Sequence, residues 1–374
     1  MQRLLFWILT LSIIAGQLIK IPLGSGGLSL LDLTIIIACL TGLYQIKFKL
    51  KNPPIFLKAA GVFVFIGTVS LFFSPLHLTA AQMLSSFFYT IRFSLYILFG
   101  WLLSSGAFPY LRNNIGKVLI NSGVGLAILG LLQFIFLPDL RFLTPFGWDP
   151  HYFRTVSTFL DPNFAGAYFV LTLLLLRTRQ KWMLVIFLAL LTTFSRSSYL
   201  MFLISGSTLA FLEKSKTLFL KILIAFIILM AGFWVYTQLI SKPHNIDRDQ
   251  SASYRLDTWQ QGFNLFQKSP FLGIGYNAYR FGIEKYQLGP EQFIQSHGSS
   301  SNDSSLLFVL TTTGIVGLIS YLYFLFCLVK SDWKNNLIIT SAIAGLLIHS
   351  FFADSLFYPP ILAWIILISA TPKK

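Results

Sequence analysis

Charged residues are scarce in this chain. They make up only 11% of its 374 residues, whereas a soluble domain carries about 25%. A water-soluble globule of this size cannot cover its surface with so few charges, so the composition excludes a cytosolic enzyme, a secreted domain and a disordered protein. Apolar residues are abundant instead: 55% of the chain is hydrophobic, 38 residues are Phe, and the mean hydropathy is +0.71. This composition is typical of a polytopic membrane protein.

Cysteine is almost absent as well. Cys39 and Cys327 both lie within apolar runs, so they cannot form a disulfide framework or a cysteine-based metal site. We expect both to be small buried apolar side chains. The sequence also lacks the His/Asp/Glu spacing of a zinc site and the Asp-x-Asp pair typical of a magnesium site. It therefore predicts no metal and no cofactor.

Acidic residues are few, 13 against 28 Lys and Arg, and the formal net charge is +15. Most of the basic residues fall in the segments that are cytoplasmic if the N-terminus is cytoplasmic, where they face anionic lipid. Both termini are then inside, and most of the acidic residues lie at the outer face. Because no Lys/Arg-rich run has interleaved aromatic residues, we expect membrane lipid, not nucleic acid, as a partner.

Long apolar runs alternate with short polar segments. A bilayer core of about 30 Å needs about 20 mostly apolar residues per helix. The predicted fold class is therefore an all-α polytopic membrane protein of about twelve transmembrane helices, with residues 1–374 as a single integral membrane domain and 239–303 as one large extracytoplasmic loop. The predicted spans are 4–22, 28–45, 56–73, 83–103, 116–137, 163–176, 182–195, 197–212, 217–238, 304–329, 336–350 and 355–370.

Arg92 lies inside the fourth predicted span. A charge within the bilayer costs roughly 2.5–3.5 kcal/mol on insertion scales, so this side chain must face the protein interior or a wet cavity. Two interpretations are open at this point. Arg92 forms an ion pair with a carboxylate such as Asp32, or it binds an anion.

Arg196 is expected at an outer turn between two spans. It stands among the hydroxyl groups of Thr193, Ser195, Ser197 and Ser198. An arginine that only snorkels to the lipid headgroups does not need so many hydroxyls. The segment therefore favours an anion-binding nest over a lipid anchor.

Arg154 lies in the loop 138–162, just above the predicted membrane surface. Nothing in its local sequence explains a cation at this position. The end of the same loop, Asp161-Pro162, is typical of a helix start, with Pro near the first turn. We expect the sixth span to begin there.

The loop 239–303 holds most of the polar residues of interest. Its segment 253–268 has helical spacing, with Arg255 and Trp259 on one face at i, i+4. An apolar stripe formed by Leu256, Trp259, Phe263 and Phe266 indicates an amphipathic helix that rests on the membrane. Further on, Gly273 and Gly275 permit positive φ and close backbone approach.

His297 precedes the tenth predicted span by a few residues, and Asp303 stands directly before it. A neutral imidazole near the operating pH is a natural general base. A histidine in a loop is more often incidental, however, and residues alone leave its role open.

These segments together resemble the O-antigen ligase-like superfamily, which includes O-antigen ligases, O-antigen polymerases and bacterial O-oligosaccharyltransferases. The most specific matches are Tyr254-Arg255-Leu256-Asp257-Thr258-Trp259 with Pro270-Phe271-Leu272-Gly273-Ile274-Gly275, and Asn302-Asp303-Ser304-Ser305-Leu306 with Thr313-Gly314-Ile315-Val316-Gly317-Leu318. Phe194-Ser195-Arg196 and Asp161-Pro162-Asn163 support them. One departure stands out: the family usually has His-Asn here, but Ser301 precedes Asn302.

The resemblance implies a GT-C-like membrane glycosyltransferase of a bacterial plasma membrane. Its donor is a glycan on a polyprenyl pyrophosphate such as undecaprenyl pyrophosphate, and its acceptor is a hydroxyl of a glycan, lipid or protein. A metal-free reaction on the outer face is implied. The candidate catalytic residues are His297, Arg255 and Asp303, with His297 or Asp303 as the base. The candidate substrate-binding residues are Arg154, Arg196, Arg92, Trp259, Asn302 and Tyr276.

A transporter or flippase of lipid-linked glycans is the alternative function. Such a protein is expected to place its charges in a central cavity that both faces can reach. In this sequence the inside loops are short and basic, and the candidate residues cluster outside. That distribution favours glycan transfer over transport.

Overall fold

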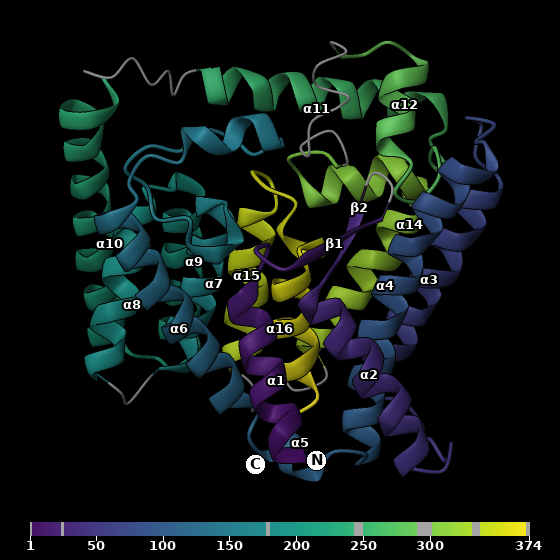
Figure 1. The fold of residues 1–374 in the computed structure, drawn as a ribbon, viewed down its shortest axis with the longest axis horizontal. Helices are drawn as coiled ribbons and strands as arrows, with labels where there is room; N and C mark the ends of the chain where they lie inside the picture. The colour runs from purple at the N-terminus through teal and green to yellow at the C-terminus, as the bar shows by residue number, and fades with distance from the viewer. Residues whose placement is uncertain are drawn as a thin grey trace.

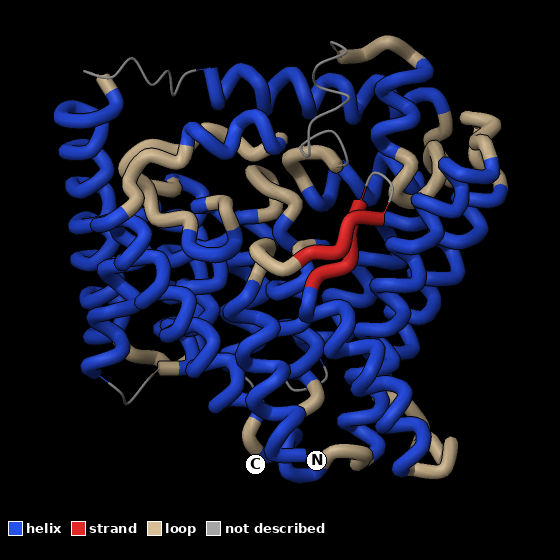
Figure 2. Tube along the Cα trace, in the orientation of Figure 1, coloured by secondary structure: helices blue, strands red, loops and turns tan. Residues whose placement is uncertain are grey.

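The computed structural model describes residues 2–23, 26–176, 180–242, 250–289, 301–330 and 337–371. These residues form a bundle of helices with one short β-hairpin (Figures 1 and 2). Both chain termini lie at one end of the bundle, and α11 (Gln250–Lys268) lies across the opposite end (Figure 1). The described part of the loop 239–303 is thus largely helical and covers one end of the molecule.

The helices follow the apolar runs of the sequence, and each predicted span coincides with one. In the first half they are α1 (Gln2–Ala15), α2 (Leu30–Gln45), α3 (Ile55–Phe72), α4 (Ala80–Ser105), α5 (Pro109–Asn113) and α6 (Ile115–Phe136). In the second half they are α7 (Pro162–Leu175), α8 (Gln180–Thr193), α9 (Arg196–Leu212), α10 (Lys216–Tyr236), α11, α12 (Tyr279–Lys285), α14 (Ser305–Lys330), α15 (Leu337–His349) and α16 (Pro359–Ser369). Short 3-10 segments are Arg141–Phe146, Ser157–Phe159 and Ser355–Phe357, and a π-helical turn, Thr237–Ser241, continues α10.

Among the described residues, five helices are long and apolar enough to cross a membrane by length and composition. They are α3, α4, α6, α14 and α10 together with its π-helical turn. Six further apolar helices are shorter, at 10–17 residues. The chain is therefore a helical membrane protein, and the twelve-span topology stays a prediction.

The hairpin β1 (Lys20–Leu23) and β2 (Gly26–Ser29) was not predicted. The first predicted span, 4–22, was too long, because α1 ends at Ala15. Gly16 follows with φ +55°, and the N–H of Gln17 donates to the carbonyl of Thr158. This turn leads into the hairpin, which lies across the front of the bundle (Figure 2).

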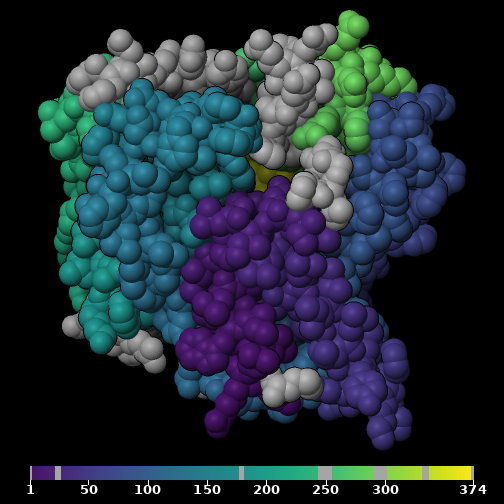
Figure 3. Space-filling view, viewed as in Figure 1, coloured from purple at the N-terminus to yellow at the C-terminus, as the bar shows by residue number. Residues whose placement is uncertain are grey.

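The last helix, α16, forms the centre of the core. Nine consecutive residues from Pro360 to Ile368 are buried, with Trp364 fully enclosed. A helix that is apolar on every side is expected in such a position. Its place behind the N-terminal segment leaves little of it visible in Figure 3. The two cysteines are buried free thiols, as the sequence predicted.

Helix α14 is broken at Gly314, which has φ +67° and ψ −169°. The break frees backbone groups, and the loop before α12 satisfies them. The N–H groups of Ile274 and Gly275 donate to the carbonyls of Thr311 and Thr312, both at 3.0 Å. Within a membrane, where unsatisfied backbone groups cost several kcal/mol, this pairing allows the helix to break.

The same loop also accepts hydrogen bonds from the far side of the break. The N–H groups of Ile315 and Val316 donate to the carbonyls of Pro270 and Phe271, at 2.9 and 3.3 Å. The loop and the helix backbone approach so closely that a Cβ on Gly314 would lie 2.2 Å from the Phe271 carbonyl oxygen. Glycine is therefore required at this crossing.

Gly314→Ala should lower the thermal unfolding temperature of the purified protein in detergent. The positive φ alone costs about 1–2 kcal/mol for a residue with a Cβ, and the contact with Phe271 adds to this. Gly116→Ala is the matched control, because a Cβ there meets no atom within 4 Å. Equal unfolding temperatures for the two variants would contradict the role of the crossing.

Candidate active site

Ionisable side chains from three distant segments meet near the end of the bundle that α11 covers. Asp149 and Asp161 come from the loop 138–162 and Arg255 from α11, while Asp303 stands before α14. They interact electrostatically: in addition to burial, the negative charge of Asp303 raises the pKa of Asp149, and the positive charge of Arg255 lowers the pKa of both carboxyls. The fold therefore brings together residues separated by more than a hundred positions.

Asp161 begins α7, as predicted. Its carboxylate accepts hydrogen bonds from the N–H groups of Asn163 and Phe164, and Pro162 occupies the first turn. Burial raises the pKa of the Asp161 carboxyl, and the negative charge of Asp149 raises it further. The cap residue thus also belongs to the acidic group of the site.

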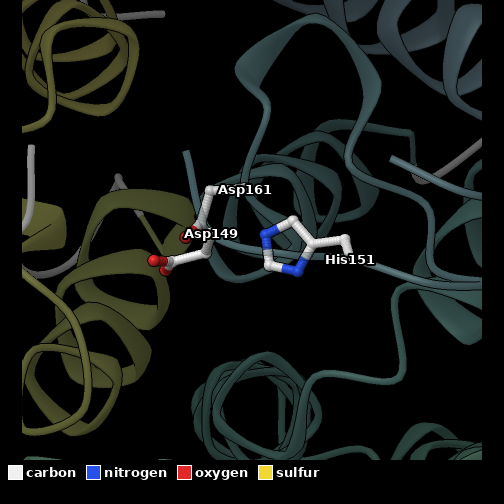
Figure 4. A group of neighbouring side chains, drawn as sticks. All are labelled: Asp149, His151 and Asp161. Carbon is white, nitrogen blue, oxygen red and sulfur yellow. The ribbon is translucent and has the colours of Figure 1, made fainter. Parts of the chain in front are cut away.

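Asp149, His151 and Asp161 lie close together (Figure 4). One ligand atom from each lies within 4.8 Å of those of the other two. Carboxylate oxygens and imidazole nitrogens are ordinary ligands of divalent cations, so this group could hold one. Sequence spacing did not reveal it, because nine residues separate His151 from Asp161.

Arg154 belongs to the same loop and anchors it to the end of α8. Its Nε donates to the Thr193 carbonyl at 2.9 Å, and its Nη2 donates to the Phe194 carbonyl at 3.4 Å. Its charge also acts on Asp149 and Asp161. The structure therefore places this predicted arginine beside the acidic group.

Asp303 is linked to α11 by two interactions. Thr258 approaches its Oδ2 at 3.4 Å, and the charge of Arg255 lies nearby. Burial raises the pKa of the Asp303 carboxyl, and Asp161 adds to this, whereas Arg255 and Thr258 partly offset it. Of the predicted residues, Arg154, Arg255 and Asp303 are thus brought to one place.

Asn302 is buried and holds the outer segments together. Its amide donates to the Thr258 carbonyl and, at 3.0 Å, to the Tyr279 hydroxyl. Its Oδ1 accepts from the N–H of Ser304 at 2.9 Å. These bonds connect α11, α12 and the start of α14, so the structure gives Asn302 a positioning role.

Arg196 and its neighbouring hydroxyls face different ways. Arg196 is exposed, and its guanidinium lies 5.8 Å from the Phe233 ring centroid on α10. Ser195 and Ser197 donate to Asn163 Oδ1 at 2.7 and 3.3 Å. The hydroxyls therefore join the starts of α7 and α9 and do not surround the arginine as the nest interpretation required.

The same hydroxyl cluster reaches a buried histidine that the sequence analysis missed. His349 Nε2 lies 3.4 Å from the hydroxyls of both Ser197 and Ser198, and the residue is fully buried. It is the last residue of α15, within an apolar run, which is why sequence position alone did not mark it.

Arg92 forms the ion pair that was one of its two interpretations. Its Nη2 lies 3.1 Å from Asp32 Oδ2, and the guanidinium also donates to the Gly27 carbonyl. Tyr96 donates a further hydrogen bond to Asp32 at 3.0 Å. This pair joins α4 to α2 and to the hairpin.

The two predicted aromatic residues differ in their surroundings. Tyr276 is buried among the rings of Phe63, Phe308 and Phe357. Trp259 is half-buried 6.5 Å from the Phe351 ring, and its indole N–H has no hydrogen-bond partner among the described residues. Of the two, Trp259 is therefore the better placed to contact a ligand.

The amphipathic helix predicted at 253–268 forms, and its placement on the membrane stays a prediction. Leu256 and Phe263 of the predicted apolar stripe are 66% and 51% exposed. The buried positions are Thr258, Gly262 and Leu265, and the Gly262 carbonyl accepts a hydrogen bond from Thr311 of α14. Helix α11 therefore packs on α14 through the face that carries Gly262. His297 lies outside the described residues.

The fold and the site define a helical membrane protein with a group of carboxylates and arginines at one end. Residues 165–322 match the family model described as O-antigen ligase. No curated protein sequence matches the chain. The family match takes in Arg196, Arg255, Trp259, Asn302 and Asp303, and it confirms the resemblance to the O-antigen ligase-like superfamily that the motifs indicated. It supports a membrane protein that processes glycans, of the ligase or polymerase type.

Arg92→Leu should destabilise the protein by about 3–5 kcal/mol, because Asp32 becomes a buried charge without a partner. The double variant Arg92→Leu/Asp32→Asn should recover much of that loss, since neither charge then remains. Chemical unfolding in detergent measures both. If Arg92→Leu keeps normal stability but weakens donor binding, Arg92 is a substrate ligand and not a structural ion-pair partner.

Proposed function

We propose that this protein is a glycosyltransferase that moves a glycan from a polyprenyl-pyrophosphate donor to an acceptor hydroxyl. The reaction takes place at the outer face of a bacterial plasma membrane and needs no metal. The observation that carries the proposal is the meeting of Arg154, Arg255 and Asp303 with Asp149 and Asp161 at one end of the bundle.

The arginines suit the leaving group. When the anomeric carbon is attacked, negative charge develops on the pyrophosphate, and fixed cations in a poorly hydrated site stabilise that charge strongly. Arginine binds phosphate oxygens with two parallel hydrogen bonds. Arg255 is partly exposed on α11 and is our main candidate for this contact, with Arg154 second.

The carboxylates suit the sugars and the acceptor. Ionised carboxylates accept hydrogen bonds from hydroxyl groups, and Asp149, Asp161 and Asp303 all retain some exposure. The unpartnered indole N–H of Trp259 lies on the same helix face as Arg255 and offers a donor and a stacking surface. The candidate site thus has one part for an anion and another for hydroxyls.

A transporter of lipid-linked glycans is the alternative. It calls for polar residues along a route between the two faces of the membrane. Apart from the Arg92–Asp32 ion pair, the grouped charges of the described residues lie at one end instead, next to helix α11, which covers it (Figure 1). This distribution favours the transferase.

Purified protein should transfer glycan from a polyprenyl-pyrophosphate donor to at least one of a panel of acceptors carrying hydroxyls, measured by mass spectrometry. Turnover should persist in excess chelator. Arg255→Ala should lose about 10²–10³-fold in rate, the loss typical for one transition-state donor. Arg255→Lys should also be impaired, because it loses the bidentate fork.

Lys268→Ala is the matched control, since it removes an exposed cation from the same helix. Normal turnover in Arg255→Lys would assign Arg255 to a simple surface charge. Loss of turnover on chelation would instead assign a catalytic cation to Asp149, His151 and Asp161. If no donor and acceptor pair supports transfer, the proposed function fails.

The proposed orientation has both termini in the cytoplasm and α11 outside. Gly289→Cys should therefore be labelled in intact cells by a membrane-impermeant thiol reagent, whereas Asn52→Cys should be labelled only after the cells are opened. Cys39 and Cys327 are each 2% exposed and should stay unlabelled in the folded protein. The reverse labelling pattern would contradict the orientation.

A further inference from the structure

Asp354 is an acidic residue that the sequence analysis did not consider. It lies beside Ser301, the position where the family usually has histidine. The Ser301 hydroxyl lies close enough to Asp354 to lower the pKa of that carboxyl. The Ser305 hydroxyl, at the start of α14, donates to the Ala353 carbonyl at 3.4 Å and also lowers the pKa of Asp354. Asp354 itself lies in the turn between α15 and α16.

One oxygen of this carboxylate is unusually placed. Asp354 Oδ1 is buried and has no hydrogen-bond partner among the described residues. A buried polar atom without a partner is costly, and such atoms in native proteins often serve catalysis or receive a ligand. The residue as a whole is only partly buried, so the turn is close to the molecular surface.

Among the described residues, the groups that face Asp354 are anionic or neutral. They are Ser301, Ser305 and Asp303 on the segment leading into α14, Tyr321 within α14, and Tyr276 from the loop before α12. Asp303, by contrast, has the charge of Arg255 beside it. Of these two carboxylates, Asp354 is therefore the one beside which the described part of the chain places no neutralising cation.

Such surroundings favour the protonated carboxyl. Burial raises the pKa of Asp354 to about 7, and the negative charge of Asp303 adds to this, while the two serine hydroxyls lower it. A base is most effective when its pKa is near the operating pH, because it is then both available and strong enough to take the proton.

We propose that Asp354 is the proton acceptor of the glycan transfer and that Ser301 is a positioning residue that orients it. The proposal rests on the transferase function proposed above. It chooses Asp354 over His297 and Asp303, the two candidates that the sequence offered. Because Asp303 is electrostatically coupled to Arg255, its role is to hold that arginine in place.

The step is balanced in atoms and charge. The acceptor O–H bond breaks and its proton passes to Asp354 Oδ1, directly or through the Ser301 hydroxyl. The acceptor oxygen forms a bond with the anomeric carbon, and the bond from that carbon to the pyrophosphate oxygen breaks. The electron pair leaves with the lipid pyrophosphate, whose charge the arginines stabilise.

Asp354→Asn keeps the size of the side chain and removes the proton acceptor. We expect turnover to fall about 10²–10⁴-fold while donor affinity stays within about twofold of wild type. Wild-type turnover should fall about tenfold per pH unit below neutrality, as Asp354 becomes protonated. This acid limb should be absent from the residual activity of Asp354→Asn and present, at a reduced rate, in Asp354→Glu.

Two controls separate the chemistry from folding. Asp257→Asn changes an exposed carboxyl on α11 and should keep the wild-type rate and profile. Infrared spectroscopy of the wild type should show a protonated carboxyl band that titrates near neutral pH and is lost in Asp354→Asn. Thermal unfolding identifies any variant that is simply misfolded, and the infrared band of the wild type still tests the protonation.

The proposal is overturned if Asp354→Asn retains the wild-type rate and acid limb, or if His297→Ala or Asp303→Asn alone removes that limb. Either result leaves the transferase function standing, because the wild type is active in both. A wild type that transfers glycan from no donor overturns the proposed function and the proton acceptor together.

Discussion

The break in α14 at Gly314 is the constraint on which much of the outer half depends. A bilayer offers no water to the backbone groups that a broken helix releases, so the loop 270–275 must supply their partners. Once that loop is pinned, Tyr276 enters the aromatic core and α12 begins at Tyr279. Tyr279 in turn receives the amide of Asn302, which stands next to Asp303. A single backbone crossing thus determines where the start of α14 lies.

Electrostatics acts in two ways in this molecule. Between the helices, Arg92 and Asp32 form an ion pair and join α4 to α2. At the end covered by α11, carboxylates outnumber the arginines beside them, and burial raises the pKa of both Asp161 and Asp303. Shifted pKa values of this kind are common at sites where binding and catalysis occur. The proposed chemistry is therefore assigned to the carboxylates and arginines at the end covered by α11, and not to the Arg92–Asp32 pair.

Several parts of the site could be read from local sequence. Asp161-Pro162 predicted the start of α7, and both Gly273 and Gly275 have the positive φ that their sequence allowed. Arg92 was expected to need a partner, because a lone charge in a membrane is costly. Each of these features depends on neighbours in the chain or on the solvent, so the residues themselves contain the information. The direction of Arg196, away from the surrounding serine hydroxyls, depends on helix packing and was not foreseeable.

The sequence by itself determined the class of the protein and the position of its helices, because hydrophobic burial in a membrane depends on composition and run length. It also determined the family resemblance. Only the tertiary structure decided which polar residues meet: Asp149 and His151 with Asp161, and Ser301 with Asp354. The reason is physical. Contacts between distant segments arise from the packing of whole helices and from the backbone pairing at Gly314, and neither is encoded in the spacing of the residues that finally touch.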